Sequence, residues 1–157
     1  MKELAGLCAF TLFLGQAVYA DGTLALSCLE GGTQTTEELS IPEIQELGVQ
    51  SLETVTPWTD SHVFEGPFLR DVAALCGCDY EGALVTALNN YAAVIPEALV
   101  LEDDPILAYL RDGKPMDVAQ KGPYWIIYDF GGNEAYGAAA YHNTSVWQVS
   151  SVSVGCR

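Results

Sequence analysis

Cys76 and Cys78 are separated only by Gly77 and form the closest pair of reactive side chains in the sequence. A C-x-C pair can exchange disulfides when one of its sulfurs is held as a thiolate. This pair follows an expected helix over residues 68–75, and the negative end of the helix dipole there opposes a thiolate. We therefore predict a structural disulfide at this position and not a redox centre.

Other side chains that could do chemistry lack the spacing of a catalytic or metal site. His62 and His142 are the only histidines, and they lie far apart in the sequence. The acidic segment 102–105 lacks the alternating ligands of a calcium loop. The sequence contains no nucleophile elbow, zinc-protease motif or phosphate-binding loop. We accordingly predict no metal site and assign no catalytic residue.

The first twenty residues have the pattern of a secretory signal peptide. They combine a basic residue, an apolar run and a small-x-small cleavage site: Lys2, residues 4–14 and Val18–Ala20. We predict cleavage after Ala20, with an uncleaved membrane anchor as the alternative because Glu3 is unusual in such a segment. Cys8 lacks the preceding Gly or Ala of a lipoprotein signal. Residues 21–157 then form one exported domain, periplasmic or secreted.

The chain is strongly acidic. It has 21 acidic and six basic residues, for a formal net charge of −15. Such a charge repels nucleic acids and anionic membrane surfaces. No apolar run after the signal segment is long enough to cross a bilayer. We therefore expect neither a nucleic acid nor, after cleavage, a membrane as a partner.

Four cysteines remain after cleavage, and four cysteines allow three pairings. An even number in an exported chain indicates two disulfides. We predict that Cys28 pairs with Cys156, which would join the first strand to the last, and that Cys76 pairs with Cys78.

Apolar alternation and turn signals predict a mostly extended chain with few helices. Ser40 and Glu43 form a capping box for a short helix that ends at Gly48. A second helix is expected over residues 68–75. Residues 131–144 are rich in Gly and Ala and are expected to form a loop. Extended segments are expected at residues 24–30, 49–56, 62–65, 82–96, 106–116, 124–130 and 145–154, which together give an α+β domain.

Six segments occur in the order found in one known family: "TVTPWTD", "FEGPFLRDVAAL", "ALNNYAAVIP", "ILAYLRDGKPM", "KGPYWIIYDF" and "SVWQVSSVSV". Together they resemble the sulfite-oxidase-fold molybdopterin-binding domain, and more narrowly its small exported bacterial members. The resemblance covers roughly residues 24–154. It implies a mixed β-sheet fold with short flanking helices.

The same resemblance implies a molybdenum site whose main residues are missing here. The family's enzymes ligate molybdenum through a cysteine thiolate, a soft ligand. The matching position is Thr54, and residues 49–65 contain no cysteine. Trp125 stands where those enzymes tend to have an arginine for the pterin. Val146-Trp147 stands where they tend to have Lys-Trp.

The resemblance and the missing ligands together predict an accessory module that binds a small ligand or a periplasmic protein, with no cofactor. Fold alone does not determine activity, and two alternatives remain. One is a molybdopterin-dependent oxidoreductase that holds its cofactor without a cysteine; the other is a purely structural protein without a pocket. The residues expected to line the former cofactor groove are Thr54, Trp58, Arg70, Asn89, Tyr91, Lys121 and Trp125.

Overall fold

The computed structural model describes residues 22–157. The predicted signal peptide and its cleavage site after Ala20 lie outside the described residues. Within residues 22–157, no helix is both long and apolar enough to cross a membrane.

The larger sheet has five strands in the order β2-β1-β11-β5-β6. Its first and last strands along the chain, β1 (Leu24–Glu30) and β11 (Val149–Cys156), are parallel neighbours. The other pairs are antiparallel and involve β2 (Thr33–Leu39), β5 (Tyr80–Ala87) and β6 (Ala92–Pro96). The period-2 alternation that predicted β1 is confirmed, because Leu24 and Leu26 are buried.

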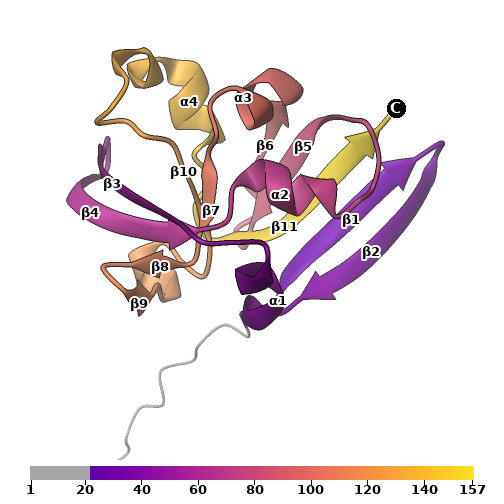
Figure 1. Ribbon diagram of the computed structural model, residues 1–157, viewed down its shortest axis with the longest axis horizontal. Coiled ribbons are helices and arrows are strands. Elements are labelled where there is room, and N and C mark those ends of the chain that lie inside the picture. The colour runs from indigo at the N-terminus through magenta and orange to yellow at the C-terminus, as the bar shows by residue number, and fades with distance from the viewer. Residues whose placement is uncertain (1–21) are drawn as a thin grey trace, which may run out of the picture.

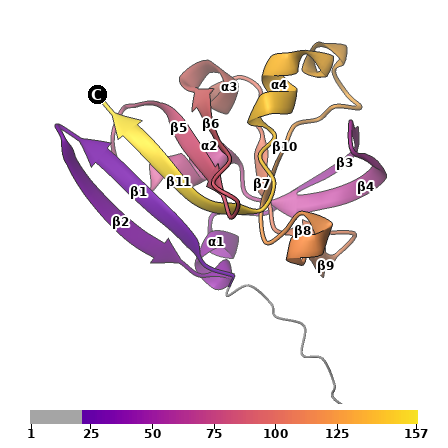
Figure 2. The same cartoon turned by 180° about the vertical axis from the view of Figure 1, so that it is seen from behind.

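Three short helices cover one face of this sheet (Figures 1 and 2). They are α1 (Ile41–Glu46), α2 (Leu69–Ala74) and α3 (Glu97–Leu101). The predicted capping box is present, since the backbone N–H of Ser40 donates to Glu43 Oε2 over 2.8 Å. The helices bury one residue or a few each against the sheet, namely Ile44, Leu69, Val72, Ala73 and Val100.

A second sheet, of four strands in the order β3-β4-β8-β9, encloses a smaller core. Its strands are β3 (Gln50–Thr56), β4 (Thr59–Gly66), β8 (Leu110–Arg111) and β9 (Lys114–Pro115). A separate pair, β7 (Ile106–Ala108) and β10 (Trp125–Ile127), packs against it. The small core contains Phe64, Ile106, Ala108, Met116, Trp125 and Ile127. The mixed fold of mostly strands with short helices agrees with the expected α+β class.

The prediction of a loop over residues 131–144 is wrong. This segment contains a 3₁₀ helix, η2 (Glu134–Gly137), and the helix α4 (Ala139–Thr144). The side chain of Asn133 caps η2 by accepting a hydrogen bond from the Ala135 N–H over 3.0 Å. Alanine has the highest helix propensity, so the Ala-rich half of the segment forms a helix although glycines precede it.

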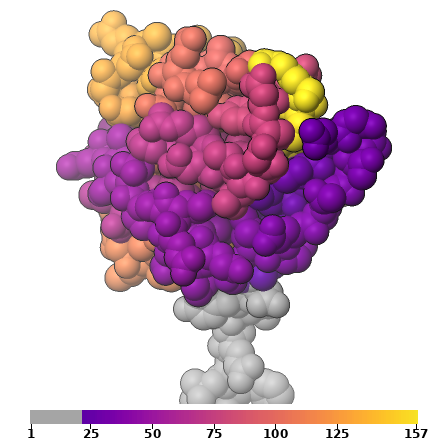
Figure 3. Space-filling view, turned by 45° about the vertical axis from the view of Figure 1, so that its right-hand side comes forward, coloured from indigo at the N-terminus to yellow at the C-terminus, as the bar shows by residue number. Residues whose placement is uncertain are grey.

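Both predicted disulfide pairings are also wrong. The bonds are Cys28–Cys76 and Cys78–Cys156. Cys28 and Cys156 lie on neighbouring strands but are not opposite each other, since Cys28 pairs in register with Val154. The chain after α2 passes close to the end of β11 and the β1–β2 hairpin (Figure 3), so each of its cysteines bonds to a different strand. Disulfides persist in oxidising compartments, which agrees with an exported protein.

Candidate functional site

A pocket of about 380 Å³ opens beside the turn between β3 and β4. Its wall comes from three places in the chain: that turn, the turn between β5 and β6, and the segment from α4 toward β11. The lining residues are Trp58, Ala87, Asn89, Tyr91, His142, Asn143, Ser145, Val146 and Trp147. The volume falls within the range of small-ligand sites in proteins.

Trp58 is held in the wall by the two-residue turn that joins β3 to β4. The Thr56 hydroxyl accepts hydrogen bonds from the N–H groups of Trp58, at 3.2 Å, and Thr59, at 3.0 Å. This local side-chain bonding is typical of threonine in tight turns. The indole then meets the His142 ring at 5.8 Å and the Trp147 ring at 5.3 Å, centroid to centroid. The turn therefore presents a fixed aromatic side chain to the pocket.

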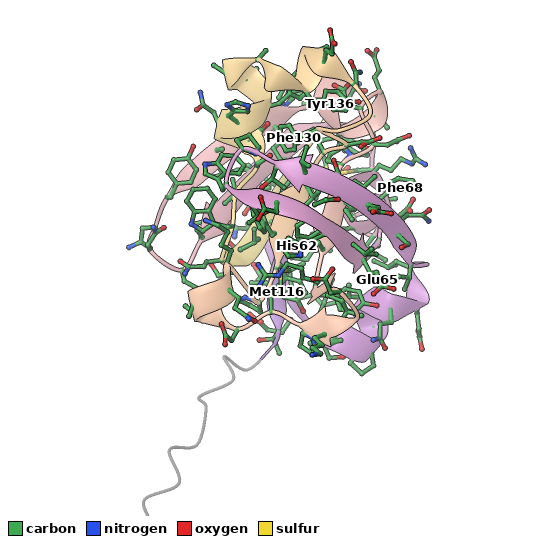
Figure 4. The ribbon with its side chains drawn as sticks, turned by 90° about the vertical axis from the view of Figure 1, so that its left-hand side faces the viewer. His62, Glu65, Phe68, Met116, Phe130 and Tyr136 are labelled. Carbon is green, nitrogen blue, oxygen red and sulfur yellow. A yellow bond between two sulfur atoms is a disulfide. The ribbon has the colours of Figure 1, made fainter. Side chains whose placement is uncertain are left out.

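Further rings lie behind the wall. Trp125 is fully buried and contacts both Trp58, at 6.1 Å, and Trp147, at 6.3 Å. Phe130 lies between the β3–β4 hairpin and α4 and meets the rings of Trp58 and His142 (Figure 4). Two of these contacts, Trp58–Phe130 and Trp125–Trp147, are edge-to-face, an arrangement that is favourable beyond the apolar area that it buries. The wall is thus supported by a packed aromatic layer.

Lys121 belongs to the same layer. Its Nζ lies 3.8 Å from the ring centroid of Trp147 and 5.3 Å from that of Trp125. Burial lowers the pKa of this lysine, although contact with the indole face favours the ammonium. Lys121 does not itself line the pocket.

Hydrogen bonds hold the rim of the pocket in place. Asn89 Oδ1 accepts from the Tyr91 N–H over 3.0 Å, so this amide caps its own turn. The Tyr91 hydroxyl donates to the carbonyl of Asn143 over 2.9 Å. Two parts of the wall that are distant in sequence are therefore tied together without any ligand.

Ser145 is the one pocket residue with a buried and unpartnered polar group among the described residues. It is 2 % exposed, and its Oγ makes no hydrogen bond within residues 22–157. The helix α4, which ends just before Ser145, is held to the core because the buried Tyr128 hydroxyl donates to Thr144 Oγ1 over 3.0 Å. Buried hydroxyls normally have a partner, so the unpaired Ser145 marks a place where a bound molecule could supply one.

Thr54 lies in the body of the fold and not in the pocket wall. It is 2 % exposed, accepts the N–H of Gly131 over 2.8 Å and donates to the Val55 carbonyl over 3.1 Å. Its hydroxyl is therefore already used by the backbone. The bond from Gly131 holds β3 to the turn that leads into η2.

Replacing Thr54 with valine should destabilise the protein. The two side chains have nearly the same shape, but valine leaves the Gly131 N–H without its acceptor. Because Gly131 is itself exposed, water can partly replace this bond, and we expect a loss of about 0.5–1.5 kcal/mol, the net value of one hydrogen bond. Urea denaturation would measure the loss, and Thr54→Ser, which keeps the hydroxyl, is the matched control. Equal stability of Thr54→Val and wild type would show that the bond has no net effect.

Arg70 and Arg157 form ion pairs away from the pocket. Arg70 pairs with Asp104, and its guanidinium also lies 4.1 Å from the centroid of the Phe68 ring. Arg157, at the C-terminus, pairs with Asp79 and Glu97. Among residues 22–157, no Asp, Glu, Lys or Arg lines the pocket. Within the described part of the chain, no group of three or more His, Cys, Asp or Glu side chains is placed to hold a metal ion.

The expected groove residues are thus divided among three places. Trp58, Asn89 and Tyr91 meet in the wall, whereas Lys121 and Trp125 lie behind it. Thr54 is bonded to Gly131 and Arg70 to Asp104. The other six lining residues were not among those expected from the sequence, and five of them lie in α4 or directly after it. No protein-family model and no curated protein matches the chain.

Proposed function

We propose that this protein is an exported binding module that holds a small molecule in the pocket beside Trp58. The main support for this proposal is the pocket itself. It is concave, it is lined by aromatic rings, and hydrogen bonds within the protein hold its rim in place without a ligand. Small-molecule sites in proteins typically combine such apolar walls with a few polar groups and are largely pre-formed. The open pocket beside Trp58 favours a binding module over the alternative of a structural protein without a pocket.

We further propose that the domain is of the sulfite-oxidase type and has lost its molybdenum site. The order of the six sequence motifs supports this assignment, as does the mixed sheet with short helices. The residues present do not fit molybdopterin. The Thr54 hydroxyl is committed to Gly131, and no cation lines the pocket to neutralise the phosphate and dithiolene of that cofactor. A molybdopterin-dependent reaction is therefore the less favoured alternative.

Native mass spectrometry of the exported protein tests this proposal. We expect a bound organic molecule, no molybdenum, and two disulfides in the intact mass. Stoichiometric molybdenum together with a pterin would contradict the proposal. So would a protein that never carries or captures any small molecule.

Removing the indole of Trp58 should weaken binding of the co-purified molecule. Truncation of a central aromatic contact commonly costs about 2 kcal/mol or more, or roughly 30-fold in affinity. Isothermal titration of Trp58→Ala against wild type would measure the change. Val94→Ala is a matched control, because Val94 is an exposed apolar residue that does not line this pocket. Equal affinities of Trp58→Ala and wild type would place the binding site elsewhere.

A further inference from the structure

We propose that the ligand of this pocket is an uncharged ring compound that carries hydroxyl or amide groups and forms a hydrogen bond with Ser145. This inference rests on the proposed function and narrows it to one chemical class. Three features of the wall support it: the absence of Asp, Glu, Lys and Arg among the described lining residues, the arrangement of the rings, and the unpaired hydroxyl.

The charges around the pocket disfavour an ionic ligand of either sign. An anion would approach a chain of net charge −15 and find no Lys or Arg in the wall. A cation would find no carboxylate there, and Trp147 already carries the Lys121 ammonium 3.8 Å from its ring centroid. Taking an ion out of water without a partner is costly. A neutral molecule avoids this cost.

The rings favour a flat or ring-shaped molecule with an apolar face. The planes of Trp58 and Trp147 are inclined at 70°, and those of Trp58 and His142 at 66°. Steeply inclined rings form the sides of an angular pocket and do not stack on one another. Pyranose sugars and neutral heterocycles both present an apolar face to such rings and hydrogen-bonding groups at their edges. Both classes of molecule therefore combine the apolar face and the hydrogen-bonding edge that suit this wall.

Polar groups in the wall suit the edge of such a molecule. Ser145 can both donate and accept a hydrogen bond, and its Oγ has no partner within residues 22–157. The amide of Asn89 uses its oxygen for the Tyr91 N–H, and its nitrogen is still a donor. A hydroxyl or amide on the ligand would satisfy Ser145 without bringing a charge into the pocket.

Saturation-transfer NMR with matched probes at pH 8 tests the class. The sugar arm compares glucose and N-acetylglucosamine with glucuronate. The heterocycle arm compares nicotinamide with the anion nicotinate and the cation 1-methylnicotinamide. We expect the neutral probes of one of these two sets to bind with an affinity at least tenfold higher than that of their charged counterparts. We also expect Trp58→Ala to lose this binding.

Tighter binding of a charged probe that still requires Trp58 would overturn the inference and leave the proposed function standing. Failure of every neutral probe would also overturn the inference, while the co-purified molecule found by native mass spectrometry would decide the proposed function separately.

Ser145→Ala should weaken binding of the neutral probe without destabilising the protein. Loss of one hydrogen bond to a neutral ligand corresponds to an affinity lower by about 2- to 13-fold. The melting temperature of the free protein should stay the same or rise, because the hydroxyl has no partner to lose. Ser150→Ala is the matched control, since Ser150 Oγ bonds to the Thr86 carbonyl over 3.1 Å and does not line the pocket. Unchanged affinity in Ser145→Ala would overturn the assigned role of this residue.

Discussion

The double variant Cys78→Ser/Cys156→Ser should lose about 4–5 kcal/mol of its free energy of unfolding, according to the chain-entropy estimate for a closed loop. The bond joins residues 78 positions apart, so its removal frees a large part of the unfolded chain. It also ties the end of β11 to the segment after α2. We expect this to be one of the two largest losses of stability among the variants proposed.

The second disulfide provides an internal comparison. Cys28→Ser/Cys76→Ser opens a loop with a separation of 48, which should cost roughly 0.4 kcal/mol less than opening the longer one. Urea denaturation of both double variants under oxidising conditions would measure the two losses. A loss below about 1 kcal/mol in both variants would contradict the expectation.

Single substitutions distinguish the observed pairing from the alternative suggested by sequence. In Cys78→Ser the released thiol should be Cys156. If Cys76 paired with Cys78 instead, the released thiol would be Cys76. Thiol labelling followed by peptide mapping would identify the free cysteine, and labelling of Cys76 would contradict the structure.

The contrast between local and non-local signals explains which parts of the fold the sequence could predict. The β1 strand and the Ser40–Glu43 capping box depend on neighbours within a few residues, and both are present. The turn at Asp112-Gly113 is equally local, and both residues adopt the positive φ angles of a tight hairpin. Disulfide pairing depends on strand register and on the path of the chain after α2, and neither is encoded near the cysteines.

The candidate site follows the same division. Trp58 could be singled out because a large aromatic beside a proline in a turn is conspicuous in the sequence. Ser145 could not, because its burial depends on how α4 is held against Tyr128, whose hydroxyl donates to Thr144 at the end of that helix. The helix α4 was not expected because glycines, which have low helix propensity, precede its alanines in the sequence. A site assembled from three distant segments gives no single motif to recognise.

Gly66→Ala should be among the most damaging small substitutions in the chain. A Cβ at this position would lie 2.0 Å from the Leu107 carbonyl oxygen and 2.9 Å from the Ala108 Cα, so the clash is with backbone and not with a flexible side chain. The Leu107 N–H also donates to the Pro67 carbonyl over 2.9 Å, which holds the two segments at this separation. The Gly-Pro step thus permits the close approach of β4 to β7.

Separating β4 from β7 would disturb the smaller core, which backs the pocket through Trp125. We expect a loss of roughly 3 kcal/mol or more, at the upper end of overpacking effects. Gly137→Ala is the matched control: a Cβ there meets nothing within 4 Å and its φ is unstrained, so stability should change little. Urea denaturation of the two variants would measure the difference. Similar unfolding midpoints for Gly66→Ala and Gly137→Ala would contradict the proposed reason for glycine at position 66.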